Sequence, residues 1–551
     1  MKKILFFMFM LVVPFIVNAV EVKTSLDGLD INFNEHYEGI STADNEGYVL
    51  VGSYNSDVLI KKLNFNKELI WSKSYSGTGE DYLYDVEMTS DGYIIVGYTS
   101  STDISSLVNK GKKDAYILKL DFNGELVWMK SFGGSEDDIF YDVEVLNDGT
   151  YVAVGSSLSK DLDDMTFGTV EDGLIVRYDA NGNVLYVEVL PGNGIDIYRG
   201  ASSTKDGGYI VVGTSFSSDI GFPANSMGDG IIYKYNSSNQ LIWKQKVGVS
   251  TPAILGDGIY GAVWQTDATI GVYDVIEVSD GYVLVGRMQE QQATYEKGTY
   301  GGNMVMLFAS IMKYDFDGTY IWGKCINDSG GTFYDVVEGN DNTYWVVGNI
   351  NHDIDPVTIN YSSTGEILKQ YNIRGSSYSA QNTSVEMIYN NYFVVAGKYS
   401  GSSITYSEGE TGSSLMKSDT FNGKYDSYIF DIDYVYNIEN VTEDTNGNVE
   451  VERVNGLGLA RVSANTGYKV YNVKVFDADN NELTVVDNGD GTYSFPLSKD
   501  VRVEVTFMED VDNPKTFDSS FLIILISLFF GGVVALLFYL ILKHDKVSIE
   551  L

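Results

Sequence analysis

A short apolar run that ends in glycine recurs along most of the chain. It reads Gly-Tyr-Val-Leu-Val-Gly up to Gly52 and Gly-Tyr-Ile-Ile-Val-Gly up to Gly97. Variants of the same run end at Gly155, Gly213, Gly286, Gly348 and Gly397. A continuous apolar run of this length is typical of a β-strand that is buried on both faces. Seven copies in one chain predict a fold assembled from one repeated unit.

Residues 84–140 show the plan of one repeat. Turn residues, Ser90-Asp91-Gly92 and Asn123-Gly124, separate strand-like segments without helical periodicity. These segments are 84–89, 93–99, 114–121 and 125–132, with a loop at 100–113. Four antiparallel strands per repeat are the blade of a β-propeller. A β-helix needs shorter and more even coils, and separate sandwiches need about 100 residues each. We therefore expect an all-β, seven-bladed β-propeller.

One stretch of this pattern carries a family resemblance. It runs Ser131-Phe132-Gly133-Gly134-Ser135-Glu136-Asp137-Asp138 into Tyr141 and then Asp148-Gly149. The preceding unit adds Gly97-Tyr98-Thr99-Ser100-Ser101, Asp114-Ala115-Tyr116-Ile117-Leu118-Lys119-Leu120-Asp121 and Trp128. Over residues 20–436 the chain resembles the propeller repeats of large exported bacterial and archaeal proteins. The resemblance implies the propeller fold and no particular activity.

The ring needs a fourth strand in its last blade. The seventh repeat ends with its third strand at 427–433. The segment 22–25 lies about as far before Tyr37 (12 residues) as 70–73 lies before Tyr84 (11 residues), so we expect the N-terminal strand to complete the blade. A fourth-strand aromatic recurs as Trp71, Trp128, Tyr186, Trp243 and Trp322. A sugar-stacking surface is one interpretation of this series, but repetition at one strand position favours packing at the blade periphery.

Residues 437–509 predict a second, small β module. Strands are expected at 450–454, 460–463, 469–476, 483–486, 492–496 and 501–507. The runs 467–470, 488–495 and 500–507 resemble the small β repeats that form stalks in Gram-positive surface proteins, which implies a spacer. The acidic turns at 477–481 and 487–491 are typical of Asx turns, with Ca²⁺ binding as the alternative.

The two ends of the chain predict export and anchoring. Lys2, Lys3 and the apolar run 4–17 indicate a signal peptide over 1–19. Residues 521–542 carry no charge and are long enough to cross a bilayer, with a cytoplasmic tail at 543–551. The linker 510–520 contains Asn513-Pro514-Lys515-Thr516-Phe517, which resembles a sortase motif, although Asn513 and Phe517 depart from it. The resemblance implies that Thr516 is joined to the cell wall; a retained single-pass anchor is the alternative.

The charge and the motifs of the sequence argue against several classes of function. The formal net charge is −39, and phosphate binding needs a basic face, so we expect no nucleic-acid partner. The single cysteine, Cys325, excludes an internal disulfide framework. The sequence has no His-Glu-x-x-His signature, Gly-x-Ser-x-Gly elbow or phosphate loop, so we expect no enzyme and no cofactor. Fragments of Ca²⁺ loops at Asp121, Asp179 and Asp315 occupy hairpin turns, and turn chemistry explains them.

A tyrosine followed by an acidic residue opens the first strand of five repeats. The acidic residues are Glu38, Asp85, Asp142, Asp274 and Asp335. Equivalent positions of a propeller lie at one height around its axis, so we expect these carboxylates to form a ring near one mouth of the channel. Arg199-Gly200 and Ser384 interrupt the series. Carboxylates held so close together need Ca²⁺, raised pKa values or backbone donors to offset their repulsion. Hydrogen bonds from the backbone of the neighbouring blade are the simpler explanation.

Together these features indicate a cell-surface binding or adhesion module with a monomeric ectodomain. Its ligand would be an extracellular glycan or protein, bound through the loops 100–113, 156–171, 247–272 and 288–304. An extracellular glycan-acting enzyme is one alternative, because 76 acidic residues conceal any catalytic pair. A purely structural envelope protein is the other.

Overall fold

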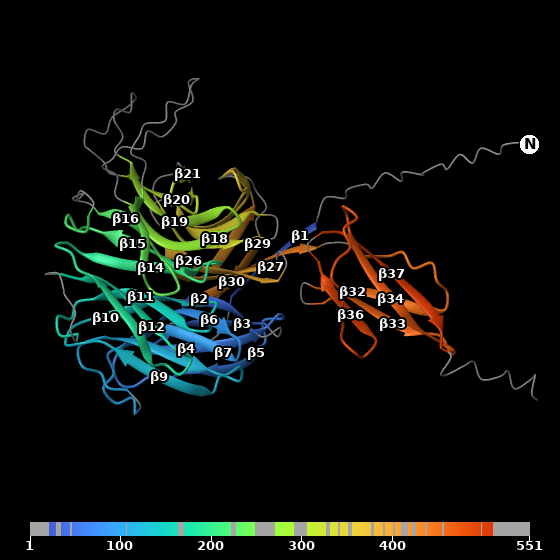
Figure 1. Ribbon diagram of the computed structural model, residues 1–551, viewed down its shortest axis with the longest axis horizontal. Coiled ribbons are helices and arrows are strands. Elements are labelled where there is room, and N and C mark those ends of the chain that lie inside the picture. The colour runs from blue at the N-terminus through green and yellow to red at the C-terminus, as the bar shows by residue number, and fades with distance from the viewer. Residues whose placement is uncertain are drawn as a thin grey trace, which may run out of the picture. The chain divides into compact units, whose positions relative to one another are not determined.

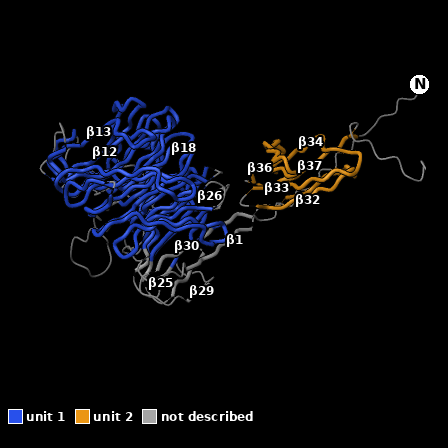
Figure 2. Tube along the Cα trace, turned by 90° about the horizontal axis from the view of Figure 1, so that it is seen from below, with its two compact units in different colours: residues 1–434 blue, residues 435–551 orange. Residues whose placement is uncertain are grey.

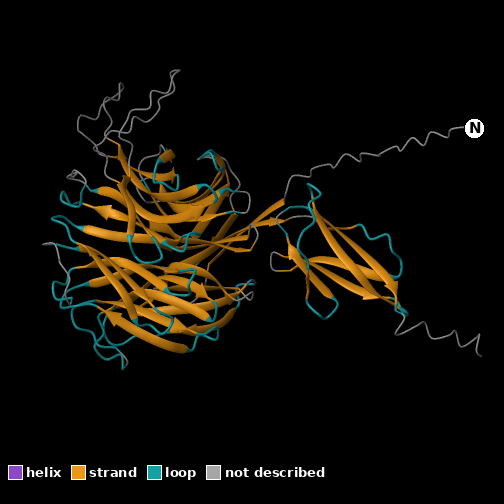
Figure 3. Cartoon of the chain, viewed as in Figure 1, coloured by secondary structure: helices purple, strands orange, loops and turns teal. Residues whose placement is uncertain are grey.

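In the computed structural model every element of the described residues is a β-strand (Figure 3). The chain divides into two compact units, residues 1–434 and 435–551 (Figure 2), close to the predicted boundary at 436–437. The structure describes residues 21–28, 35–43, 47–105, 107–162, 170–221, 228–247, 270–290, 306–326, 331–339, 342–350, 355–375, 379–389, 392–400, 403–408, 417–420, 426–435, 438–454, 457–497 and 499–510.

The described part of unit 1 contains repeated four-stranded antiparallel sheets that resemble propeller blades (Figure 1). Five sheets have four consecutive strands: β2 (Glu35–Ala43), β3 (Gly47–Tyr54), β4 (Asp57–Asn64) and β5 (Leu69–Lys73); β6 (Asp81–Thr89), β7 (Gly92–Thr99), β8 (Asp114–Leu120) and β9 (Leu126–Phe132); β10 (Asp138–Val145), β11 (Tyr151–Ser157), β12 (Asp172–Tyr178) and β13 (Val184–Leu190); β14 (Asp196–Ser203), β15 (Tyr209–Ser215), β16 (Asp229–Tyr235) and β17 (Leu241–Val247); β18 (Ile270–Val278), β19 (Gly281–Glu290), β20 (Met306–Tyr314) and β21 (Tyr320–Cys325).

The other two sheets of unit 1 are less regular. The sixth contains β22 (Thr332–Glu338), β23 (Tyr344–Ile350), β24 (Asp355–Tyr361) and β25 (Ile367–Gly375), extended by β28 (Ser403–Glu408) and β29 (Lys417–Thr420). The seventh has the order β1-β30-β27-β26, with β1 (Glu21–Gly28), β30 (Asp426–Val435), β27 (Tyr392–Ser400) and β26 (Ser379–Tyr389). β1 therefore lies at the outer edge beside β30, the place predicted for the N-terminal strand. The two extra strands of the sixth sheet were not predicted.

The first strand of each sheet faces a common axis. β2, β6, β10, β14, β18, β22 and β26 contact one another in this order, and β26 contacts β2 in turn. These contacts run in a cycle through the described first strands, and we call the space that the strands surround the channel. The second and third strands of the sheets are buried on both faces, as the apolar runs predict: every residue of β7 and β8 is buried. The core lies between neighbouring sheets, where for example Val49 and Ile60 pack with Tyr93.

The fourth-strand tryptophans pack against the neighbouring sheet, which confirms the predicted packing role. Each indole N–H donates to a backbone carbonyl in the last hairpin turn of the next sheet: Trp71 to Phe122 at 3.2 Å, Trp128 to Ala180 at 3.0 Å, Trp243 to Phe316 at 3.1 Å and Trp322 to Ser363 at 3.1 Å. Each ring also covers the glycine of that turn: Gly124, Gly182, Gly318 and Gly365. The position of the tryptophans is therefore set by the neighbouring blade.

Unit 2 contains two small sheets. One has the order β31-β37-β34 and the other β32-β33-β36-β35, from β31 (Ile438–Asn440), β32 (Gly447–Val454), β33 (Leu457–Ala464), β34 (Tyr468–Asp477), β35 (Val486–Asp487), β36 (Thr492–Pro496) and β37 (Val501–Glu509). The predicted strand at 483–486 is wrong except at its last residue. Asp477 Oδ1 accepts hydrogen bonds from the backbone N–H groups of Asp479 and Asn481 at 2.9 and 2.8 Å, so this acidic turn is an Asx turn.

Several predictions about the ends lie outside the described residues. These are the signal peptide 1–19, the sorting residue Thr516, the apolar segment 521–542 and the tail 543–551. Within the part of the chain that the structure describes, no helix is long and apolar enough to cross a membrane.

Candidate functional site

The first strand of every sheet in unit 1 carries a β-bulge at the same place. In β6 the pairing passes from Leu83 to Asp85 and leaves Tyr84 outside the ladder. The residues left out in this way are Glu38, Tyr84, Tyr141, Arg199, Tyr273, Tyr334 and Thr383. A bulge bends the strand and redirects its side chain. Because the first strands line the axis, these residues form one layer near the end of the channel at which the strands begin.

Five residues of this layer form what we call the tyrosine collar: Tyr84, Tyr141, Arg199, Tyr273 and Tyr334. The ring centroids of Tyr84 and Tyr141 are 5.1 Å apart, and those of Tyr273 and Tyr334 are 5.4 Å apart. The Arg199 guanidinium lies between the two pairs, 4.3 Å from the Tyr141 centroid and 5.8 Å from that of Tyr273. All five side chains are half-buried. The collar therefore offers aromatic faces, hydroxyl groups and one cation.

Glu38 does not belong to the predicted acidic ring, because the prediction placed it one residue out of register. The bulge in β2 skips Glu38 itself and pairs Gly39 with Val51, so Gly39 takes the place that Asp85 holds in β6. Glu38 instead lies in the layer of the tyrosine collar. There it accepts hydrogen bonds from the Lys398 ammonium at 2.6 Å and from the Tyr82 hydroxyl.

We call the four remaining residues, Asp85, Asp142, Asp274 and Asp335, the acidic ring. Each carboxylate accepts a hydrogen bond from a backbone N–H of the next sheet: Asp85 from Val143 at 3.0 Å, Asp142 from Ala201 at 2.5 Å, Asp274 from Val336 at 3.0 Å and Asp335 from Val385 at 2.8 Å. The predicted bonds to the neighbouring blade's backbone are thus confirmed. The ring links consecutive sheets next to the axis.

The aspartates of the ring also bond one another in two pairs, Asp85 with Asp142 and Asp274 with Asp335. Two carboxyl groups can share a hydrogen bond only when one keeps its proton. Burial, and then the charge of the partner, raises the pKa of Asp142 and of Asp274 well above the usual range. Among the described residues no group of three or more His, Cys, Asp or Glu could hold a metal ion. A shared proton in each pair and the backbone donors together offset the charge of the four aspartates.

Glycines stand at two of the three places where the aspartate series is interrupted, and Ser384, which donates a hydrogen bond to Asp335 at 2.7 Å, stands at the third. A Cβ on Gly39 would lie 2.9 Å from the Cα of Asp85, and a Cβ on Gly200 would lie 2.8 Å from the Cα of Asp274. No side chain fits at these two joints, since the backbones of neighbouring sheets approach each other directly. The two glycine breaks therefore mark close contacts between sheets.

A second acidic layer lies two residues further along the strands, at Glu87, Glu144 and Glu386. Successive channel-facing residues of a strand are two positions apart. Burial, together with the charge of Asp85, raises the pKa of Glu144 to about 7, and burial with the charges of Asp335 and Asp85 raises that of Glu386 to about 8. This layer was not predicted from the sequence, although the two-residue period of a β-strand could have indicated it.

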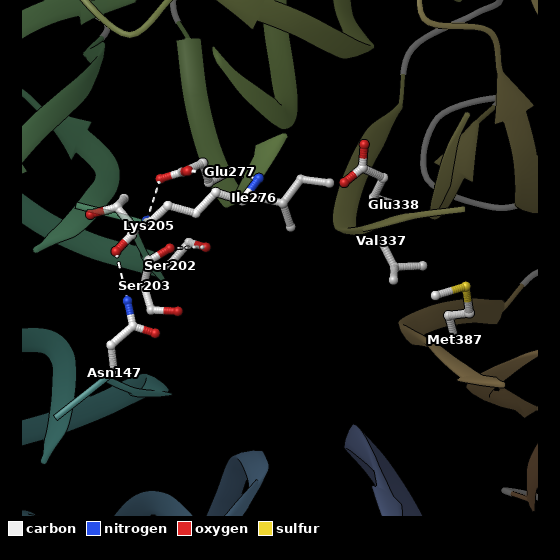
Figure 4. A pocket seen from close by; sticks show the side chains of 10 residues that line it. Asn147, Ser202, Ser203, Lys205, Ile276, Glu277, Val337, Glu338 and Met387 are labelled. Atoms are coloured by element: carbon white, nitrogen blue, oxygen red, sulfur yellow. Dashed lines mark hydrogen bonds and ion pairs between the residues drawn. The ribbon is translucent and has the colours of Figure 1, made fainter. Parts of the chain in front are cut away.

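A cavity of about 430 Å³ lies where the first strands of the third to seventh sheets end (Figure 4). Figure 4 shows Lys205 and Glu277 on one side and Glu338 and Met387 on the other. The Lys205 ammonium is 4.0 Å from the Glu277 carboxylate, which also accepts the Lys205 backbone N–H at 3.1 Å. Burial raises the pKa of Glu277 and of Glu338. The cavity is lined by both polar and apolar side chains, and no sequence motif marked it.

The predicted contact loops are only partly visible. Residues 163–169, 248–269 and 291–305, which make up much of three of the four loops, lie outside the described residues. The loop 100–113 is described except for residue 106, and Asn109 Nδ2 donates from it to the Thr99 carbonyl at 3.2 Å.

Comparison with known proteins gives matches of structure alone. No protein-family model and no curated protein matches the chain. The WD40 domain of Neurospora crassa Pan2 is 8% identical, and the match covers 72% of this chain and 89% of that one with a TM-score of 0.39. The WD40 domain of Toxoplasma gondii coronin is 9% identical, and the match covers 76% of this chain and 89% of that one with a TM-score of 0.38. A protein of unknown function from Dyadobacter fermentans is 12% identical, and the match covers 74% of this chain and 99% of that one with a TM-score of 0.34. The description of the fold rests on the sheet topology of this chain.

Proposed function

We propose that the chain is a binding module displayed at the cell surface, a seven-bladed β-propeller closed by its N-terminal strand. The tyrosine collar carries this proposal. Tyrosine and arginine are enriched where proteins bind ligands, because each presents a large contact area with a polar end. The bulges keep the collar out of the strand ladder, and its side chains remain half-buried at the channel mouth instead of entering the core.

The position of the collar supports a ligand that approaches from one face of the ring. Strand direction alternates within a blade, so the connections between second and third strands lie at the same end as the start of the first strands. The loop 100–113 is such a connection, between β7 and β8. A glycan or protein that reaches the collar would also meet these loops, which are the contact surfaces expected from sequence.

Surface display rests on the ends of the chain. The signal-like segment 1–19 and the apolar segment 521–542 support export and retention. Mass spectrometry of the C-terminus of the native protein tests the anchor. An intact Leu551 excludes cleavage after Thr516, whereas a terminus at Thr516 linked to peptidoglycan supports the sortase-like signal.

The purified full-length protein, applied to glycan arrays and to extracellular protein extracts, tests the binding role. We expect retention of a ligand without turnover, and loss of retention in the double variant Tyr141→Ala, Arg199→Ala. The control is Tyr471→Ala, which removes a tyrosine that is 67% exposed in unit 2. Turnover of a glycan would favour the extracellular enzyme instead. Retention of nothing, by a folded protein, would favour a purely structural envelope role.

A further inference from the structure

Asp114 and Asp138 face each other where the second and third sheets of the ring meet. A Cβ on Gly133 would lie 2.7 Å from Asp114 Oδ1 and 2.7 Å from Asp138 Oδ2. Asp138 Oδ2 accepts hydrogen bonds from the Gly134 backbone N–H at 2.8 Å and from Ser159 Oγ at 2.7 Å. This joint therefore brings two carboxylates close together, and one of them is well supplied with donors.

Asp114 lacks hydrogen-bond donors of the kind that Asp138 has. Its Oδ2 accepts the Lys110 backbone N–H at 2.9 Å, but its Oδ1 has no hydrogen-bond partner among the described residues. The residue is only 1% exposed, so water does not replace the missing donor at the surface. A buried carboxylate oxygen without a partner is unfavourable, and such atoms are rare in folded proteins. The oxygen is directed toward the space beside Asp138.

The equivalent aspartates of the next two sheets each form an ion pair with a lysine. Asp172 begins β12, and the Lys160 ammonium lies 3.0 Å from its Oδ2. Asp229 begins β16, and the Lys246 ammonium lies 2.6 Å from its Oδ1. At both of these joints a cation from the protein itself offsets the charge of the aspartate.

Neither lysine has a counterpart beside Asp114. Lys160 stands 12 residues before Asp172, and the residue at the same distance before Asp114 is Thr102. Lys246 pairs with Ile231 across the sheet, and the matching pair in the second sheet is Ser131 with Tyr116. The second sheet therefore keeps the aspartate of the repeat and lacks both of the lysines that accompany it elsewhere.

Gly133 also leaves the joint unfilled. The residue five positions before the first aspartate of the next sheet is Ser76, Gly133 and Pro191 at three successive joints. Ser76 Oγ accepts the Val58 backbone N–H at 2.7 Å, so a side chain occupies that joint. At the joint that lacks both of these lysines, the residue is a glycine, and a Cβ there would crowd the two carboxylates, so no side chain separates them.

We propose that a metal cation of the Ca²⁺ class binds at this joint, with Asp114 Oδ1 and the Asp138 carboxylate as ligands. Both ligands are hard oxygen donors, which Ca²⁺ prefers, and their two negative charges match a divalent ion. The ion replaces the ammonium group that the sister sheets supply. Burial, and to a lesser degree the charge of Asp138, raises the pKa of Asp114 to about 6 despite the opposing charge of Lys110, so the cations of the protein do not fully neutralise this carboxylate. The site is separate from the acidic ring at the axis.

The test uses the full-length protein in detergent, freed of metal with EGTA and then titrated with CaCl₂ to about 5 mM, above the range in which extracellular Ca²⁺ modules bind. Heat of binding and the melting temperature Tm are measured at constant ionic strength, set with choline chloride. We expect Ca²⁺ to bind and to raise Tm in the natural protein. The same is expected in Asp121→Asn, a control that removes an acidic residue from an exposed turn of the same sheet.

Two variants locate the effect. Asp114→Asn should abolish the rise in Tm. Thr102→Lys, which keeps both aspartates and supplies the missing ammonium, should melt above the natural protein in EGTA and no longer respond to Ca²⁺. The proposal is overturned if Ca²⁺ leaves the natural protein unchanged, or if Thr102→Lys responds as the natural protein does. It is also overturned if NaCl raises Tm as much as CaCl₂ at equal ionic strength. Should Asp114→Asn fail to fold, Thr102→Lys decides alone.

Discussion

Trp128 covers Gly182 of the neighbouring sheet so closely that a Cβ on the glycine would lie 2.8 Å from Cε3 of the indole. The indole N–H donates to the Ala180 carbonyl in the same turn at 3.0 Å. In the next sheet Tyr186 replaces the tryptophan, and the turn that it would cover has Asn239 at φ 60° in place of glycine. The fourth-strand aromatic and the turn residue of the next sheet thus vary together, because an indole leaves no space for a side chain.

This contact predicts that Gly182→Ala is much more destabilising than Gly149→Ala. The two glycines have φ of 77° and 78°, so both substitutions carry the strain of a left-handed residue, about 1–2 kcal/mol. Gly149 has nothing within 4 Å of its Cβ position, whereas Gly182 has the indole. Overpacking should add about 1–3 kcal/mol to the loss in Gly182→Ala. Urea unfolding of both variants measures the difference, and equal losses would show that the indole moves aside.

The proton shared by Asp142 and Asp85 predicts unequal effects of two substitutions. In Asp142→Asn the amide can still accept the Ala201 N–H and donate to Asp85, so the free energy of unfolding should stay within about 1 kcal/mol of the natural value. Asp142→Ala removes both bonds and leaves a buried N–H unpaired, which should cost about 1–3 kcal/mol. Thermal and urea unfolding at neutral pH compare the two. An Asn variant as unstable as the Ala variant would mean that the charge of Asp142 is needed.

The sequence predicted the ring of sheets well because the apolar runs mark strands that are buried on both faces. It failed at Glu38 because a bulge adds one residue to a strand without changing its hydrophobic pattern, and the register then shifts. Glu87 and Glu386 were missed for a different reason. Their acidic character indicates solvent exposure in a strand pattern, and only the closure of the ring places them inside the channel. The packing role of Trp128 could be predicted, because the tryptophan recurs at one position of the fourth strand, and the bulge in the first strand does not change that position.

Deleting β1 should weaken the seventh sheet. A chain that starts at Ile31 keeps β2 and loses the strand beside β30, which leaves the edge of β30 unpaired. We expect a lower melting temperature and faster amide hydrogen exchange in β30, with exchange in β8 changed much less. A deletion of residues 511–551 serves as the control because it removes no strand of the ring. Unchanged exchange in β30 would contradict closure by the N-terminal strand.

The acidic layers predict that the protein is more stable at about pH 5.5 than at about pH 8.5. A carboxyl group with a raised pKa in the folded state binds protons more tightly there than in the unfolded chain. Its stabilising contribution is therefore complete below the unfolded pKa and is lost as the pH rises through the folded value. For Glu144 this pH window extends from 4.5 to about 7, and for Glu386 it extends from 4.5 to about 8. Each carboxyl contributes at most about 1.4 kcal/mol for each pH unit crossed.

Few groups oppose this pH dependence. Asp91 and Asp206 have lowered pKa values, so their contribution is lost only below pH 3.8. His36, whose pKa is lowered by burial, opposes the trend below pH 6.5, but it is a single group. Glu386 is repelled by Asp335, Asp85 and Glu144, so Glu386→Gln should raise Tm at pH 8.5 and flatten its dependence on pH. Glu125→Gln, which alters an exposed pair with Lys73, should keep the slope of the natural protein. A Tm that rises steadily from pH 5.5 to 8.5 would show that cations or water neutralise the channel instead of protons.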